Sequence, residues 1–130
     1  MANQLPSAVA TFNGLNNAID TNLQNLASLN EVNIALVDAR KQLVEARNAI
    51  LNEYNDLTKH PEGQKALGGN EGSRAAAIDS MVSKERDLVE ALEARHNQLR
   101  YESSVNMLEL DRWKFTLRLL ETGGSRADSD

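Results

Sequence analysis

The spacing of the apolar residues is the feature that most constrains how this chain can fold. On both sides of a glycine-rich segment, residues that suit a helix–helix seam recur at alternating steps of three and four. Because an α-helix completes a turn every 3.6 residues, this spacing places them on one face of a helix. The sequence therefore predicts two long amphipathic helices. The first run is Leu29, Val32, Leu36, Ala39, Leu43, Ala46, Ile50, Tyr54 and Leu57, and the second is Leu88, Leu92, His96, Leu99, Ser103, Asn106, Leu110, Trp113, Leu117 and Leu120.

The segment between the two runs predicts a loop over about 59–72. It contains Pro61 and four glycines, and a proline disfavours helical geometry in the residue before it. Asn70 or Ser73 is expected to cap the second helix. That helix is expected to continue to Thr122, where the pair of glycines that follows would end it.

The first 27 residues are less regular than the rest of the chain. They carry another amphipathic stripe, but its phase slips before the main run begins. Ser28 and Glu31 have the spacing of a capping box, in which the serine would start a new helix. We therefore predict an N-terminal amphipathic helical segment over 1–27, a helical hairpin over 28–122 and a flexible tail over 123–130, with one continuous first helix as the alternative. The stripe consists of Phe12, Leu15, Ile19, Leu23 and Leu26.

The predicted fold class is all-α: a long antiparallel helical hairpin with a shorter N-terminal helix, assembling into an oligomeric helical bundle. The second helix carries more apolar surface than one neighbour can cover. Large apolar surfaces left in water mark interaction sites, although residues 8–27 could cover part of this one as a third helix. The residues expected at an interface between copies are Leu99, Tyr101, Val105, Leu108, Leu110, Trp113, Phe115, Leu117, Leu119 and Leu120.

Composition narrows the possible functions. The chain has no cysteine, which excludes disulfides, thiolate metal sites and a cysteine nucleophile. Its net charge of −5 disfavours a grip on nucleic-acid phosphates, although residues 95–118 contain five basic and three acidic side chains. No leader sequence and no apolar run of bilayer-spanning length is visible, so we expect a cytoplasmic protein without a membrane partner.

Two sets of residues are candidates for ligand chemistry. Lys65 and Arg74 flank the expected start of the second helix, where free amides favour anions such as phosphate, and Arg112, Lys114 and Arg118 form a second basic group. The alternative interpretation of the segment around Lys65 and Arg74 is a flexible turn before a capped helix, with no ligand. Whether a nucleotide or nucleic acid binds is left open at this stage.

The segment Glu93-x-x-His96 has the spacing of a carboxylate–imidazole pair in the di-metal sites of helical bundles. Only one copy is present, so a second chain and a facing carboxylate such as Asp38 would be needed to complete the site. Small hairpin proteins that resemble encapsulated ferritins assemble such sites. A histidine at such a position is more often a half-buried seam residue, and no cofactor is predicted.

The second half of the sequence resembles a group of small coiled-coil, helical-hairpin proteins of unknown function from bacteriophage and prophage genomes. The resemblance is carried by the Asn70-Glu71-x-x-Arg74 helix start and the aromatic–basic helix end over 110–120, and it covers about 35–120. It implies a phage accessory role in a host bacterium without fixing an activity.

The functional hypothesis that follows is a non-enzymatic, self-associating helical interaction module that binds a protein partner. The first alternative is an oligomeric binder of an anionic ligand, a nucleotide or nucleic acid, through arginines between subunits. The second alternative is a di-metal carboxylate oxidase.

Overall fold

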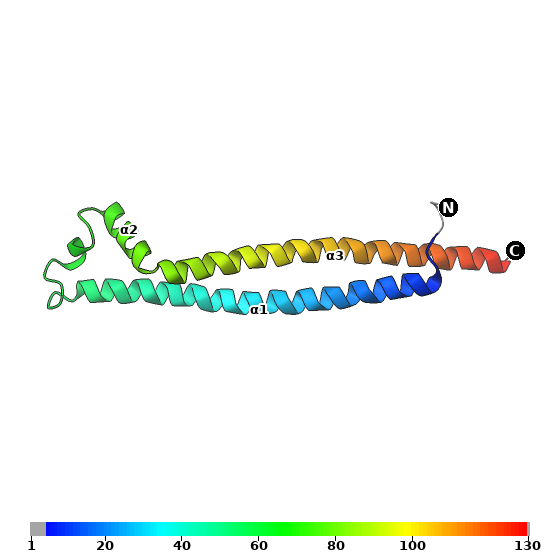
Figure 1. Ribbon diagram of the computed structural model, residues 1–130, viewed down its shortest axis with the longest axis horizontal. Coiled ribbons are helices and arrows are strands. Elements are labelled where there is room, and N and C mark those ends of the chain that lie inside the picture. Colours follow the sequence, from blue (N-terminus) through cyan, green and yellow to red (C-terminus); the bar gives the residue numbers. More distant parts are fainter. Residues whose placement is uncertain (1–4, 130) are drawn as a thin grey trace. The chain divides into compact units, whose positions relative to one another are not determined.

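The computed structural model describes the backbone of residues 5–129 and the side chains of residues 5–123. In this part of the chain the structure is all-helical, with helices α1 (Ala8–Asn55), α2 (Glu71–Met81) and α3 (Ser83–Ser129) and a short 3₁₀ helix, η1 (Gly63–Ala66) (Figure 1). The chain divides into two compact units. Unit 1 comprises Met1–Asn30 and Asn97–Asp130, and unit 2 comprises Glu31–His96.

Helix α1 runs from Ala8 to Asn55 without a break, so the prediction of a separate N-terminal helix is wrong and the continuous alternative is correct. Ser7 precedes the first residue of the helix and caps it, because its hydroxyl accepts a hydrogen bond from the amide of Ala10 at 3.1 Å. The apparent phase slip has a simple cause. The buried face of α1 in unit 1 is formed by Thr11 and Ala18, which continue the steps of three and four of the main run, while the apolar stripe lies on another face.

The loop after α1 begins earlier than Pro61 would require. Helix α1 ends at Asn55, and the Asp56 carboxylate then accepts a hydrogen bond from the Thr58 amide at 3.0 Å. Together with the hydrogen bond from the Thr58 hydroxyl, this contact lowers the pKa of Asp56 below its usual value. Among the described glycines only Gly63 has a positive φ, of 62°, and it lies at the start of η1.

The predicted second helix is divided in two. Asn70 caps α2 as expected, with its side-chain oxygen accepting from the Ser73 amide at 2.8 Å. Val82 then leaves helical geometry, with φ −104° and ψ 20°. The Val82 amide still donates to the Ile78 carbonyl at 3.0 Å, and the Val82 carbonyl accepts from the Arg86 amide at 2.9 Å. The break between α2 and α3 therefore costs only a few of the backbone hydrogen bonds of a continuous helix.

The far end of α3 also differs from the prediction. The helix continues to Ser129 rather than ending at Thr122, because Gly123 does not take the left-handed conformation of a helix C-cap. The tail over 123–130 was predicted to be flexible. Its side chains beyond residue 123 lie outside the described residues.

The core of unit 2 forms between α1 and the helices α2 and α3. Its buried members are Leu36, Ala39, Leu43, Val82 and Val89, with Ala46, Ile50 and Leu92 packed around them. Most of these lie on the two predicted runs. Leu88 begins the second run but is 47% exposed, and the buried residue beside it is Val89, three residues before Leu92.

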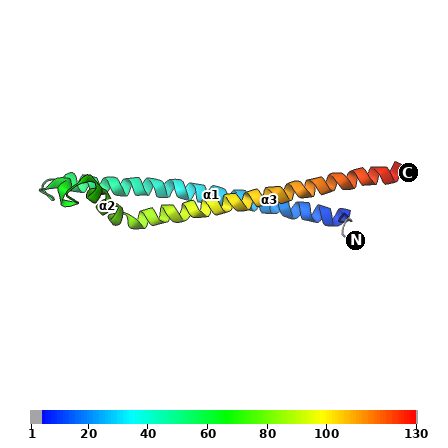
Figure 2. The same cartoon turned by 90° about the horizontal axis from the view of Figure 1, so that it is seen from above.

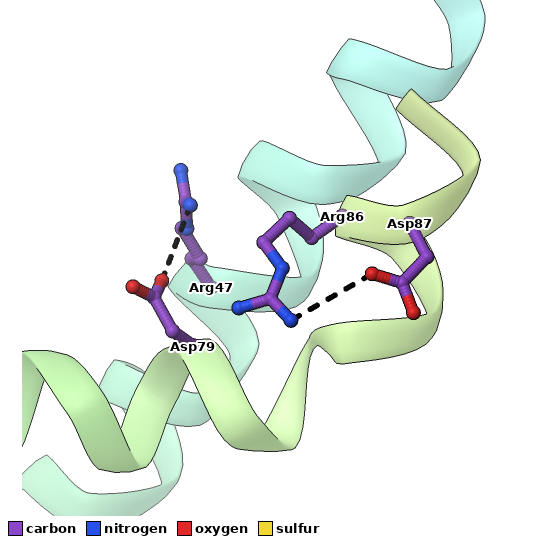
Figure 3. Close-up of polar contacts among 4 residues, drawn as sticks. All are labelled: Arg47, Asp79, Arg86 and Asp87. Carbon is purple, nitrogen blue, oxygen red and sulfur yellow. Dashed lines mark hydrogen bonds and ion pairs between the residues drawn. The ribbon is translucent and has the colours of Figure 1, made fainter. Parts of the chain in front are cut away.

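Two ion pairs link α1 to the other helices of unit 2. Arg40 contacts Glu93 on α3 at 3.3 Å, and Arg47 contacts Asp79 on α2 at 3.3 Å. Both pairs lie within unit 2 and join α1 to residues that are distant in the sequence. Figure 3 shows the Arg47–Asp79 contact beside the turn between α2 and α3, where Arg86 reaches Asp87 at 3.6 Å.

Unit 1 packs small residues of α1 against larger ones of α3. The buried Asn106 side chain donates to the backbone carbonyl of Ala18 at 3.1 Å. The Trp113 ring lies directly against Gly14: a Cβ built on Gly14 would be under 3.0 Å from three ring atoms. Each of these contacts depends on a small residue of α1 that admits the α3 side chain to the helix backbone.

Candidate interaction surface

The α3 part of unit 1 exposes a stripe of five large apolar side chains, whose exposed fractions range from 40 to 71%. We call it the α3 stripe. All five were predicted at an interface between copies, and no other part of the described chain covers them. The α3 stripe consists of Tyr101, Val105, Leu108, Phe115 and Leu119.

The other five residues predicted at that interface are buried or half-buried within unit 1. Leu99 and Leu110 are buried, at 2 and 6% exposure, and are therefore not available to a second copy. Trp113, Leu117 and Leu120 are half-buried. Periodicity alone cannot separate the two groups, because both lie on one helix at helical spacing.

Helix α1 carries a second exposed stripe in unit 1, with exposed fractions from 38 to 71%. We call it the α1 stripe, and it consists of Val9, Phe12, Ile19, Leu23 and Leu26. Residues 8–27 do not form a third helix that covers the α3 stripe. They are part of α1, and both stripes remain exposed. These residues were not among those predicted at the interface, although all of them except Val9 belong to the amphipathic stripe visible in the sequence.

The surroundings of the α1 stripe contain almost no charge. Between residues 5 and 30 the sequence has a single ionisable side chain, Asp20. A helix face that stays in water ordinarily carries charged residues opposite its packed side. Here the packed side is small and polar, and the outward side is apolar and uncharged, which is the arrangement expected of a helix that is covered by another chain.

Two hollows flank α3 in unit 1, and Glu109 lines both. The larger, of about 650 Å³, lies beside the N-terminal residues Leu5 and Pro6 and is walled by Arg112 and Trp113. The smaller, of about 400 Å³, lies between α1 and α3 and is lined by Thr21, Asn25, Tyr101, Glu102, Val105, Asn106 and Glu109. The surface near the α3 stripe is therefore recessed as well as apolar.

The candidate anion-binding residues fall into different units. Lys65 and Arg74 belong to unit 2, and Arg112, Lys114 and Arg118 belong to unit 1. The Arg74 guanidinium donates to the carbonyl of Gly68 at 3.4 Å, so it supports the loop before α2. Within unit 1, only Arg112 of the three lines a hollow.

The weak metal candidates are engaged in other contacts. Glu93 pairs with Arg40, and the Asp38 carboxylate accepts a hydrogen bond from Gln42 at 2.8 Å. His96 is half-buried. No group of three or more His, Cys, Asp or Glu side chains that could hold a metal ion is found among the described residues.

Across residues 5–129, no helix combines the length and the apolar character needed to cross a membrane. Comparisons with models of known protein families, with curated proteins and with solved structures found no match.

Proposed function

We propose that this protein is a non-enzymatic helical interaction module that associates with itself through the exposed apolar surface of unit 1. In this proposal α1 and α3 form an antiparallel helical hairpin, and copies of the hairpin assemble into a bundle that binds a protein partner. The observation that carries the proposal is the pair of exposed stripes. A phage accessory role is supported only by the sequence resemblance.

The exposed area is large enough for a stable contact. If a large apolar side chain presents about 200 Å², the ten stripe residues together expose on the order of 1,000 Å² per chain. A standard protein–protein interface buries about 800 Å² per partner. A second copy could therefore bury a full interface by covering the two stripes.

Light scattering coupled to size-exclusion chromatography, over a concentration series, tests the proposal directly. We expect the mass to rise above that of one chain as concentration increases into the micromolar range, and Leu108→Glu to weaken this association. Leu57→Glu is the matched control, because Leu57 is 63% exposed but lies in unit 2. A monomer at all concentrations up to about 100 μM would contradict the proposal.

Binding of an anionic ligand is the second candidate function, favoured by one observation: Arg112 and Trp113 line the larger hollow of unit 1. Glu109 in the same hollow opposes an anion, so we rank this function below self-association. A thermal-shift screen with nucleotides tests it, since a ligand bound only by the folded state raises the melting temperature. The shift should disappear in Arg112→Ala, and no shift with any nucleotide would rule this candidate out.

A further inference from the structure

The two stripes of unit 1 share the same internal spacing. Each is a sequence of five positions at steps of 3, 4, 3 and 4 residues, with an exposed polar residue at the third position. That residue is Asn16 on α1 and Arg112 on α3. The α1 positions are Val9, Phe12, Asn16, Ile19 and Leu23, and the α3 positions are Val105, Leu108, Arg112, Phe115 and Leu119.

From this match we propose that the α1 stripe of one copy docks in parallel on the α3 stripe of a second copy. In that register the four apolar residues of each set of five meet apolar residues of the other set, and Asn16 meets Arg112, whose guanidinium can donate to the asparagine side-chain carbonyl. Leu26 and Tyr101 lie beyond these matched positions. Polar residues paired within an apolar seam fix the register of a helix pair. The inference rests on the proposed self-association and names the surfaces that form it.

The α3 stripe pairs poorly with its own copy. A parallel two-fold contact would place Arg112 against Arg112 of the second copy. An antiparallel two-fold contact centred on residue 110 would place Arg112 opposite Leu108 and bring Glu109 of each copy close to Asp111 of the other. Like charges brought together in this way cost free energy. The α1 stripe, with Asp20 as its only charged neighbour, imposes no such repulsion from a second α3 stripe.

The α1 stripe could pair with its own copy in parallel, with Asn16 against Asn16. That contact would cover only the α1 half of the exposed apolar area of each chain, roughly 500 Å². It would leave the α3 stripe in water. Contacts between the α1 stripe of one copy and the α3 stripe of another can cover both surfaces of every copy with this chain alone.

The two stripes of one chain cannot cover each other. With about 100° of rotation per residue, the α1 stripe lies roughly 110° from the buried face of α1, and the α3 stripe lies roughly 160° from the buried face of α3. Both therefore point away from the contacts that Asn106 and Trp113 make with α1. Each copy thus offers two different surfaces, one to each of two contacts with other copies.

Mixing two single variants tests the pairing. Leu23→Glu disables the α1 stripe, and Leu108→Lys disables the α3 stripe; both positions are well exposed, so the fold should be retained. Each charge would be buried without a partner, so we expect self-association of either variant alone to weaken by more than about 100-fold. Mixed in equal amounts, they should form a 1:1 complex, because one supplies an intact α3 stripe and the other an intact α1 stripe.

The outcomes separate this inference from the proposed function. A monomeric wild-type chain would refute self-association itself. A wild-type chain that associates, together with single variants that still form homodimers or a mixture that stays monomeric, would refute only the pairing of α1 with α3. Circular dichroism of each variant shows whether the helices are intact, and Leu57→Glu again serves as the control.

Asn16→Asp gives a second readout with opposite signs for the two arrangements. A carboxylate opposite Arg112 forms a charge-assisted contact, so we expect the dissociation constant for self-association of Asn16→Asp to fall by about 3- to 10-fold relative to the wild type. In a parallel contact between two α1 stripes the same change would place two carboxylates together. Weaker association of Asn16→Asp would therefore overturn the proposed pairing.

Discussion

The contact between Gly14 and Trp113 makes a prediction in which two effects of one substitution oppose each other. Replacing glycine by alanine inside a helix ordinarily stabilises it by about 1 kcal/mol. At Gly14 the added methyl group would lie under 3.0 Å from three atoms of a rigid indole ring, which would have to move as a unit. Overpacking of this kind costs about 1–3 kcal/mol. We therefore expect Gly14→Ala to lower the free energy of unfolding by roughly 0–2 kcal/mol.

A double-mutant cycle isolates the packing contribution. In a Trp113→Ala background the obstacle is gone, so Gly14→Ala should stabilise the protein by up to about 1 kcal/mol. The coupling between the two sites should thus be about 1–3 kcal/mol. Gly123→Ala is the matched control, because a Cβ built on Gly123 meets nothing within 4 Å.

Urea unfolding followed by circular dichroism measures all the variants on one scale, at a fixed protein concentration so that association does not differ between them. The emission of Trp113, the only tryptophan, reports separately on its environment in Gly14→Ala. If Gly14→Ala stabilises the protein equally with and without Trp113, the ring does not pack on the α1 backbone and the account of unit 1 given above is wrong.

Four further variants and two conditions, pH and protein concentration, test other parts of the structure. Asn106→Ala removes a buried hydrogen bond to an α1 carbonyl and should cost about 1–2 kcal/mol in urea unfolding. Val82→Ala, at a side chain only 1% exposed, should cost about 1–3 kcal/mol, whereas Val44→Ala, at an exposed position, should change stability by less than about 0.5 kcal/mol. Hydrogen bonds from Thr58 lower the pKa of Asp56 in the folded state, so its contribution to stability should be present above its ordinary pKa of 3.8 and be lost as the pH falls through the lower folded value. Asp56→Asn should remove this acid dependence from the amide protection of the loop in hydrogen exchange. Diluting the protein should lower amide protection in unit 1 more than in unit 2.

Periodicity predicted the fold correctly where the packed helix faces consist of aliphatic residues. Leu36, Ala39 and Leu43 were identified correctly because, in unit 2, the buried face of α1 is also its most regular apolar face. On α3 in unit 1 the same rule also identified the buried Leu99 and Leu110. On the unit 1 part of α1 the packed positions are Thr11 and Ala18, so the stripe of large apolar residues lies on another face.

The break at Val82 had no recognisable sequence signal. Neither glycine nor proline lies near it. The Val82 side chain is almost fully buried in the core of unit 2, at the one residue where the backbone leaves helical geometry. A buried apolar side chain contributes about 1.5–3 kcal/mol, which is enough to offset the loss of one or two helix hydrogen bonds.

The two units differ in what stabilises them. Unit 2 buries leucine and valine side chains between its helices, so its packing removes apolar surface from water within one chain. Unit 1 has a buried threonine whose hydroxyl lacks a partner among the described residues, together with a buried asparagine and a glycine at its seam. The buried apolar residues of this seam are Ala18, Leu99 and Leu110, and ten further large apolar side chains of unit 1 stay exposed on the two stripes. Covering about 1,000 Å² of that surface would remove more apolar area from water, so in the proposed assembly unit 1 should gain stability from association while unit 2 should not.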